Sequence, residues 1–187
     1  MVYFTADLHL GHTNIIRYCS RPFKNVDEMN NTIIQNWNSK ITDKDTVVVQ
    51  GDIAFSRECL GRVRELAGKK ILIRGNHDKG FSDTKFHDVG FSTIYKKPYF
   101  FIRFEDNIPV FVNCCHAPDR SYLRNGMVNL CGHVHEKWKT DAGFVNVGVD
   151  QWNFFPVSYR DILDTYKSAY PRRMLKHTIN TEFYQLR

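Results

Sequence analysis

Carboxylate and imidazole side chains gather in one short segment near the start of the chain. The segment TADLHLGH, residues 5–12, places Asp7, His9 and His12 directly after the apolar run VYFTA. Such residues either face water at the end of a strand or bind a metal ion. The second interpretation requires further ligands from other parts of the chain.

Four further clusters of oxygen and nitrogen donors follow short apolar runs in the same way. They are Asp52 in QGDIAF, Asn76, His77 and Asp78 in RGNHD, His116 in NCCHAP, and His133 and His135 in CGHVHE. Each motif alone is weak evidence, because GD is a common turn and a lone histidine is more often structural. Five clusters in this order are hard to explain as turns, so together they favour a shared site.

The donor set predicts a particular kind of metal chemistry. Carboxylate, amide and imidazole ligands without thiolates favour Mn²⁺, Fe²⁺, Zn²⁺, Ni²⁺ or Co²⁺ over a structural cysteine-bound zinc. A set of this size is too large for one ion but suits two ions if one carboxylate bridges them. Two ions about 3.5–4 Å apart can hold a hydroxide and clamp both oxygens of an in-line displacement at phosphorus. Strand alternation would place Asp7 and His9 on one side, and likewise His133 and His135.

The first half of the chain alternates apolar runs with amphipathic segments, which must position these donors. Strands are predicted at VYFTA (2–6), TVVVQ (46–50) and KKILIR (69–74). Helices are predicted over 26–41, with Asp27 as the cap, and over 56–68, with Ser56 as the cap and Gly68 as the stop. This alternation favours βαβ units and a mainly parallel sheet, whose carboxyl strand ends converge on one rim. The first three donor clusters should therefore meet in space.

The second half is richer in strands. Residues 97–115 predict an antiparallel hairpin around the polar turn EDN (105–107), and strand-like pieces follow at 127–131, 143–148 and 154–162. A last helix is expected to begin at Arg160. We expect an α/β domain with two sheets or one mixed sheet.

Composition places limits on the class of protein. A chain of 187 residues with 42% hydrophobic content suits one globular domain over 1–187. Five cysteines, an odd number, favour a reduced cytoplasmic protein, and no apolar run approaches the roughly 20 residues of a membrane span. The net charge of +6 is compatible with a polyanionic partner, but equally with a mildly basic protein. The densest basic cluster is YPRRMLKH, residues 170–177.

The ordered motifs DLH, GD, GNHD, H and GHVH resemble those of the calcineurin-like metallophosphoesterase family. The match spans residues 7–135, and the following VNVG is also similar to the family pattern. The resemblance implies an αββα sandwich, in which two mixed β-sheets are flanked by helices. It also implies metal-assisted hydrolysis of phosphate esters by attack of a metal-bridging hydroxide.

The same resemblance implies a role for each matching residue. Asp7, His9 and His135 would bind one divalent ion, Asn76, His116 and His133 would bind the second, and Asp52 would bridge both. Mn²⁺ is the first choice for both ions, with Fe, Ni, Zn or Co as alternatives. His77 would stabilise or protonate the leaving oxygen, and Asp78 would orient His77 by hydrogen bonding.

Several residues outside these motifs have a structural and a functional interpretation. His12 can reach a substrate phosphate or lie in an exposed loop, whereas solvated surface charge is expected for Arg17 and Arg21. Arg74 is expected at a strand end, and buried packing is expected for Cys114, Cys115 and Cys131. Core or loop packing is favoured over a base-stacking platform for Trp138, Trp152, Phe154 and Phe155. His87 and His177 have no companion motif.

The favoured function is hydrolysis of a phosphodiester, in a nucleotide or a nucleic acid. Phosphomonoesterase activity is the alternative within the enzyme class. Two non-enzymatic alternatives also stay open: a metal-bearing interaction scaffold, and a nucleic-acid-binding module with structural metals. The leaving-group histidine argues against a scaffold, which would not need it. The sequence gives no indication of protein partners, and none of a membrane.

Overall fold

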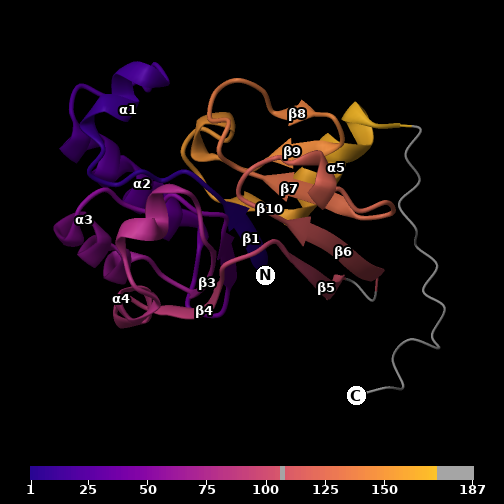
Figure 1. Cartoon of the computed structure of the whole chain (residues 1–187), viewed down its shortest axis with the longest axis horizontal. Helices are drawn as coiled ribbons and strands as arrows, with labels where there is room; N and C mark the ends of the chain where they lie inside the picture. Colours follow the sequence, from indigo (N-terminus) through magenta and orange to yellow (C-terminus); the bar gives the residue numbers. More distant parts are fainter. Residues whose placement is uncertain (106–107, 172–187) are drawn as a thin grey trace.

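Two five-stranded sheets form the centre of the computed structural model, which describes residues 1–105 and 108–171 (Figure 1). The first sheet has the order β10-β1-β2-β3-β4. Its strands are β1 (Val2–Thr5), β2 (Thr46–Val49), β3 (Lys69–Ile73), β4 (Phe91–Tyr95) and β10 (Val157–Ser158). Strands β1 to β4 are parallel, and β10 joins β1 antiparallel. The apolar, β-branched runs of β1 to β3 fit strands that are covered on both faces.

The second sheet has the order β5-β6-β7-β9-β8. Its strands are β5 (Tyr99–Glu105), β6 (Ile108–Cys114), β7 (Val128–Cys131), β8 (Thr140–Asp141) and β9 (Phe144–Asn146). The predicted β5–β6 hairpin is confirmed, although residues 106–107 of its turn lie outside the described residues. Strands β6, β7 and β9 are parallel, so both sheets are mixed.

Within the described residues, five helices and four short 3₁₀ turns accompany the sheets. The helices are α1 (Thr13–Tyr18), α2 (Val26–Lys40), α3 (Arg57–Gly61), α4 (Asp83–Asp88) and α5 (Tyr159–Ala169). The turns are η1 (Arg62–Glu65), η2 (His77–Gly80), η3 (Arg120–Tyr122) and η4 (Val149–Gln151). In Figure 1, α1 to α4 lie beside the first sheet. Helix α5 contacts β1 and β10 of the first sheet and β8 and β9 of the second.

Two helix predictions need correction. The cap of α2 is Asn25, whose side chain accepts the main-chain N–H of Glu28, and Asp27 instead occupies the first turn. The helix predicted over 56–68 begins at its cap Ser56 as expected, but its α-helical part ends at Gly61 and continues as η1. Glycine stabilises a helix interior poorly, which fits this early change to a tighter turn.

The core lies in two layers on either side of the first sheet. On the helix side, Ile33 and Trp37 of α2 pack with Val47 and Val49 of β2. Between the sheets, Val48 of β2 packs in a cluster with Val112, Leu130, Val145 and, from α5, Ile162. This arrangement confirms the predicted α/β architecture of two packed mixed sheets flanked by helices.

Parallel pairing continues beyond the carboxyl ends of β1 and β2 and fixes the loops that follow them. The Asp7 N–H donates to the Gly51 carbonyl at 3.0 Å, and the His9 N–H donates to the Asp52 carbonyl at 3.0 Å. The first two donor clusters are therefore held side by side by main-chain hydrogen bonds. Among the described residues, no helix combines the length and apolar character that crossing a membrane requires.

Candidate metal centre

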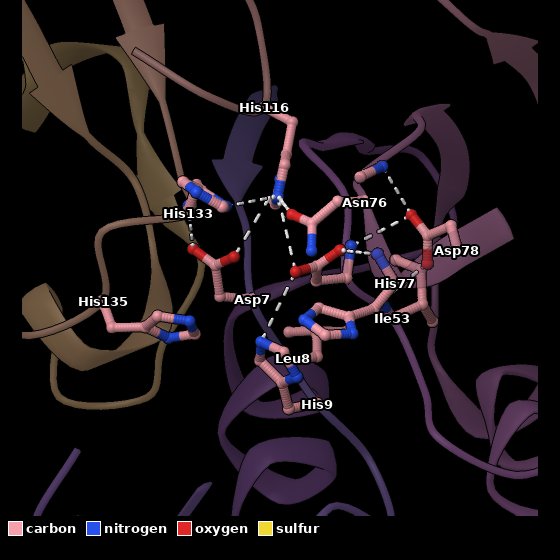
Figure 2. Close-up of polar contacts among 12 residues, drawn as sticks. Asp7, Leu8, His9, Ile53, Asn76, His77, Asp78, His116, His133 and His135 are labelled. Carbon is pink, nitrogen blue, oxygen red and sulfur yellow. Dashed lines mark hydrogen bonds and ion pairs between the residues drawn. The ribbon is translucent and has the colours of Figure 1, made fainter. Parts of the chain in front are cut away.

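Two groups of acidic and imidazole side chains lie at the carboxyl ends of the strands. In each group the donor atoms lie within 4.8 Å of one another. One group is Asp7, His9 and His135, and the other is Asp52, His116 and His133. Figure 2 shows these histidines pointing toward the space around Asp7 and the neighbouring carboxylate. The structure thus brings together distant segments of both sheets.

Asp52 lies between the two groups. Its Oδ2 is 3.7 Å from His9 Nε2 in the first group and 3.4 Å from His116 Nε2 in the second. Its Oδ1 accepts the main-chain N–H of His77 at 2.9 Å. One carboxylate oxygen is therefore oriented by the backbone, while the other faces imidazoles from both groups.

Asn76 and His116 meet at the second group. His116 Nε2 lies 2.8 Å from Asn76 Oδ1 and 3.2 Å from His133 Nδ1. The other ring nitrogen of His116, Nδ1, lies 2.7 Å from the carbonyl oxygen of Gln50. With Nδ1–H donated to that carbonyl, loss of the Nε2 proton on metal binding would free the Nε2 lone pair, which is the arrangement found in metal-bound histidines.

Left-handed backbone conformation is concentrated at the candidate ligands. Among the described residues, nine non-glycine residues have positive φ, and five of them are Asp7 (59°), His9 (53°), Asp52 (57°), His133 (71°) and His135 (49°). Such conformations cost of order 1–3 kcal/mol each and cluster at functional sites. They also correct the alternation argument, because these residues lie beyond β1, β2 and β7 and not within a pleated strand.

Consequently His133 and His135 do not point the same way. His133 belongs to the group around Asp52 and His135 to the group around Asp7. The assignment of these groups to two separate ions, which the family resemblance implied, stays a prediction.

Glycines let the chain approach both carboxylates closely. A Cβ atom on Gly75 would lie 2.1 Å from Asp52 Oδ1, and one on Gly132 would lie 2.6 Å from Asp7 Oδ2. Gly148 leaves a similar space, with Asp7 Oδ2 at 2.8 Å from the position of a Cβ. The carboxylates are therefore enclosed by main chain, which holds their oxygen atoms in place.

The first group contains buried polar atoms that fit a cation. Asp7 Oδ1 and His9 Nε2 are buried without a hydrogen-bond partner in the described part of the chain. Burial raises the pKa of Asp7 to about 6 and lowers the pKa of His9 to about 2. A buried carboxylate oxygen and an imidazole lone pair that lack partners are costly, and a divalent ion between them would satisfy both.

The second group has a matched pair of opposite pKa shifts. Burial acts to lower the pKa of His116, but the carboxylates of Asp52 and Asp7 outweigh it and raise the pKa to about 9. Burial acts to raise the pKa of Asp52, but the bond and charge of His116 outweigh it and lower the pKa to about 2. Asp52 is thus held as a carboxylate, the protonation state that a metal ligand requires.

Asp78 has partners other than the predicted one. Its carboxylate accepts the main-chain N–H groups of Gly75 at 2.7 Å, Asp52 at 3.0 Å and Ile53 at 3.0 Å (Figure 2). No hydrogen bond joins it to the His77 ring within the described residues. The carboxylate is fully buried, and it ties the loop after β3 to the loop after β2. Its contribution is therefore to the position of Asp52 and not to the orientation of the His77 imidazole.

Arg21 and Asp150 form a buried support that sequence reasoning missed. Arg21 is 4% exposed and not a solvated surface charge, and its guanidinium contacts the Asp150 carboxylate at 2.8 and 2.9 Å. It also donates to the carbonyl of Asp7 at 2.8 Å, and Asp150 lies 3.4 Å from His135 Nδ1. The position of Asp150 just after VNVG was the one available signal. This pair holds both the strand end and the imidazole of the first group.

His77, His12 and Phe55 lie at the outer rim of the site. The His77 side chain is exposed, and its ring centroid is 5.5 Å from that of His9. His12 stacks on Phe55 at 3.7 Å, and Phe55 is in turn 5.0 Å from His77. Phe55 is 42% exposed and carried no signal in the sequence. His12 therefore lies near the ligands, within an aromatic group beside His77.

The arginine and cysteine residues that lie outside the motifs have structural roles or are exposed. Arg74 donates to Asp83 and to the carbonyls of Asp78 and Phe81, as expected for a strand end. The predicted burial of Cys114, Cys115 and Cys131 is confirmed, as is the exposure of Arg17.

The aromatic residues that follow the last motif, and His87, make packing contacts and hydrogen bonds with neighbouring residues. Trp152 donates its indole N–H to the Asn146 carbonyl, and Trp138 packs beside Cys115, Cys131 and Phe144. Phe154 packs edge-on against Phe23, and the Lys40 ammonium group lies over the ring of Phe155. His87 bonds the Phe91 carbonyl. His177 and most of the basic cluster at 170–177 lie outside the described residues.

Comparisons with known proteins agree with this geometry. The chain is 37% identical over 170 residues to the uncharacterized protein MJ1445 of Methanocaldococcus jannaschii, covering 84% of this chain and 86% of that protein. It is 35% identical over 81 residues to the gene 66 protein of Mycobacterium phage L5, covering 41% and 39% of the two chains.

A solved structure shares the fold. The protein of unknown function AQ665 from Aquifex aeolicus superposes with a TM-score of 0.65 at 23% identity, over 88% of this chain and 98% of that one. The model of the calcineurin-like phosphoesterase family matches residues 1–159. Because that match covers both sheets and all the candidate ligands, the chain belongs to the calcineurin-like phosphoesterase family.

Proposed function

We propose that this protein is a phosphodiesterase whose catalytic centre holds two divalent metal ions bridged by Asp52. The observation that carries the proposal is the position of Asp52 Oδ2, 3.7 Å from His9 Nε2 and 3.4 Å from His116 Nε2. Membership of a family of phosphoesterase hydrolases supports the reaction at phosphorus.

The ligands divide between the ions as the two donor groups do. Asp7, His9 and His135 would hold one ion, Asn76, His116 and His133 would hold the other, and Asp52 would be shared. Mn²⁺ is the ion we favour, while Fe, Ni, Zn and Co ions also suit this set of oxygen and nitrogen donors.

The protein's own residues orient the substrate and move a proton. When bound, the two ions supply a hydroxide nucleophile and neutralise the charge that develops on the phosphoryl oxygens. His77 stands at the exposed rim, where its imidazole can donate a proton to the leaving oxygen. The main-chain N–H of His77 donates to Asp52 Oδ1 at 2.9 Å, which fixes the His77 backbone relative to the Asp52 carboxylate.

The rim of the site favours a diester with a nucleotide or nucleic-acid leaving group. The side chains of Asn76, His77 and His133 are exposed, so the site is open to bulky esters. The net charge of +6 favours a polyanionic substrate. We further propose a single domain over 1–187 and, from the odd number of cysteines, a cytoplasmic location.

A substrate panel tests the proposal. The metal-free protein is assayed with Mn²⁺, Ni²⁺, Zn²⁺, Co²⁺ and Mg²⁺ against bis(p-nitrophenyl) phosphate, p-nitrophenyl phosphate, cyclic and linear dinucleotides, and short oligonucleotides. We expect metal-dependent hydrolysis of diesters that exceeds hydrolysis of the monoester. Faster hydrolysis of the monoester would make the protein a phosphatase, and no hydrolysis with any ion would leave a metal-bearing scaffold.

A further inference from the structure

A hollow of about 520 Å³ adjoins the second group of ligands. The loop after β3 forms one part of its lining with Arg74, Gly75, Asn76 and Lys79. The β4–β5 connection contributes Lys96, Lys97 and Pro98, and the loop after β6 contributes Cys115, His116 and Ala117. Because Asn76 and His116 are also candidate ligands, the hollow opens directly onto the metal centre.

The lining carries a strong positive charge. It includes Arg74, Lys79, Lys96 and Lys97 and contains no acidic residue. Asp83 neutralises part of this charge by pairing with Arg74 at 2.6 Å and with Lys96 at 2.7 Å. For Lys79 and Lys97, the structure records no ion pair within residues 1–105 and 108–171, and both side chains are exposed. Two ammonium groups are therefore left for an anion that is bound beside the metal ligands.

Aromatic rings continue the surface beyond the lysines. The segment that lines the hollow runs directly into Tyr99 and Phe100 at the start of β5. Tyr99 is 37% exposed and stacks on Tyr95 at 3.8 Å, and Phe100 is 56% exposed with its ring nearly parallel to that of Tyr99. Exposed aromatic rings next to cationic side chains are the combination with which proteins bind single-stranded nucleic acid.

We infer that this hollow binds the phosphate that neighbours the scissile one in a single-stranded nucleic acid. Lys79 and Lys97 contact that phosphate, and Phe100 stacks on an adjacent base. The inference rests on the proposed function, since it places the strand relative to a reacting phosphate at the metal centre. The volume lies within the roughly 300–1,000 Å³ of sites for small molecules, which suits a nucleotide unit and not a duplex.

Strand binding is tested apart from hydrolysis. Fluorescence anisotropy with a labelled 12-nucleotide DNA strand in EDTA compares the native protein with the double variant K79A/K97A. We expect Kd to rise about 10-fold at low salt and the slope of log Kd against log salt to fall by about 0.7, because both lysines neutralise the same phosphate and each neutralised phosphate on a single strand contributes about 0.7. The control is K44A, which removes an exposed lysine at the opposite, amino-terminal end of β2.

Equal effects of K79A/K97A and K44A would overturn the inference, as would equal affinity of the native protein for a duplex of the same length. A third measurement addresses the aromatic ring. F100A should raise Kd for the 12-mer between about 5-fold and 100-fold, and should have less effect on a strand with abasic sites, because stacking needs a base. An equal effect on both strands would contradict the role of Phe100.

Hydrolysis separates this inference from the proposed function. With Mn²⁺, the ratio of kcat/KM for a trinucleotide to kcat/KM for bis(p-nitrophenyl) phosphate should fall about 10-fold in K79A/K97A and stay constant in K44A. A constant ratio in both variants, with hydrolysis intact, would overturn only the inference. Absence of hydrolysis together with lysine-dependent strand binding would overturn the phosphodiesterase proposal and support the site as a strand-binding surface.

Discussion

At the scale of single residues, the centre depends on backbone positions that tolerate almost no added atoms. Gly75 and Gly132 lie against the carboxylates of Asp52 and Asp7, and several ligands adopt left-handed conformations. The surrounding main-chain hydrogen bonds hold these conformations in place. Changes as small as one methyl group should therefore displace a ligand.

The substitution Gly75→Ala tests this close packing. Its Cβ would lie 2.1 Å from Asp52 Oδ1, so the carboxylate that we propose as the bridge must move. We expect metal affinity to fall at least 10-fold, measured by isothermal titration calorimetry with Mn²⁺. Gly80→Ala is the matched control, because nothing lies within 4 Å of the Cβ there. Unchanged affinity in G75A would contradict the assigned position of Asp52.

The leaving-group role that we propose for His77 has a distinct kinetic signature. His77→Ala should lower kcat by about 10²–10⁴-fold on a diester with an alkoxide leaving group, which needs a proton. The loss should be much smaller with a p-nitrophenolate leaving group, which departs without one. Metal stoichiometry should stay at the native value. Equal losses on both substrates would show that His77 has another role.

The buried pair of Arg21 and Asp150 belongs to the same scale. Breaking such a pair by removing one partner costs roughly 3–5 kcal/mol, because the other charge stays buried. We expect Arg21→Ala to lose about that much free energy of unfolding in urea titrations, and Arg21→Lys to recover only part of it, since lysine cannot reproduce the two-point contact. Arg17→Ala, at an exposed position of the same segment, should change stability little.

The residues of the site also show which features could be predicted from the sequence and which could not. The candidate ligands were recognisable because coordination chemistry constrains the types and the order of metal-binding residues. Arg21 was assigned to the surface because a lone arginine gives no sign that its partner is Asp150, 129 residues away. The family resemblance implied a hydrogen bond from Asp78 to His77, yet the Asp78 carboxylate accepts main-chain N–H groups instead. The direction in which a loop side chain points is set by tertiary contacts, and the spacing of residues along the sequence does not reveal those contacts.

At the scale of elements, α2 forms the main support of the first sheet. Met29, Ile33 and Trp37 are almost completely buried, and Trp37 Nε1 donates to the Ala67 carbonyl at 3.0 Å. Trp37→Ala should lower the free energy of unfolding by about 3–5 kcal/mol through the lost packing and cavity. Gln35→Ala, at an exposed position on the same helix, should stay within about 0.5 kcal/mol of the native value. A small effect of W37A would contradict the assigned core.

Helices and strands with a clear hydrophobic pattern were predictable from the sequence, and those with a weak hydrophobic pattern were missed. The runs that became β1, β2 and β3 are apolar along their length, and α2 has a clear three- and four-residue period. Strand β4, FSTIY, is an edge strand with mostly part-exposed residues, so it lacks a continuous apolar run. Helices α1 and α4 have six residues each, too few to establish a period.

At the scale of the whole molecule, the centre joins loops from both sheets. Asp7, His9, Asp52 and Asn76 follow strands of the first sheet, whereas His116, His133 and His135 follow strands of the second. Bound ions should therefore stabilise the packing of the two sheets. Mn²⁺ at 100 times its Kd should add about 2.7 kcal/mol per independent site, seen as a rise in Tm that EDTA reverses. No change in Tm would indicate that these residues do not bind metal.

The central claim is that two ions share Asp52. Anomalous diffraction at the manganese edge, from crystals grown with Mn²⁺, measures this directly. The account predicts two peaks about 3.5–4 Å apart, one beside Asp7, His9 and His135 and the other beside Asn76, His116 and His133, with Asp52 in contact with both. A single peak, or two peaks of which only one contacts Asp52, would contradict it.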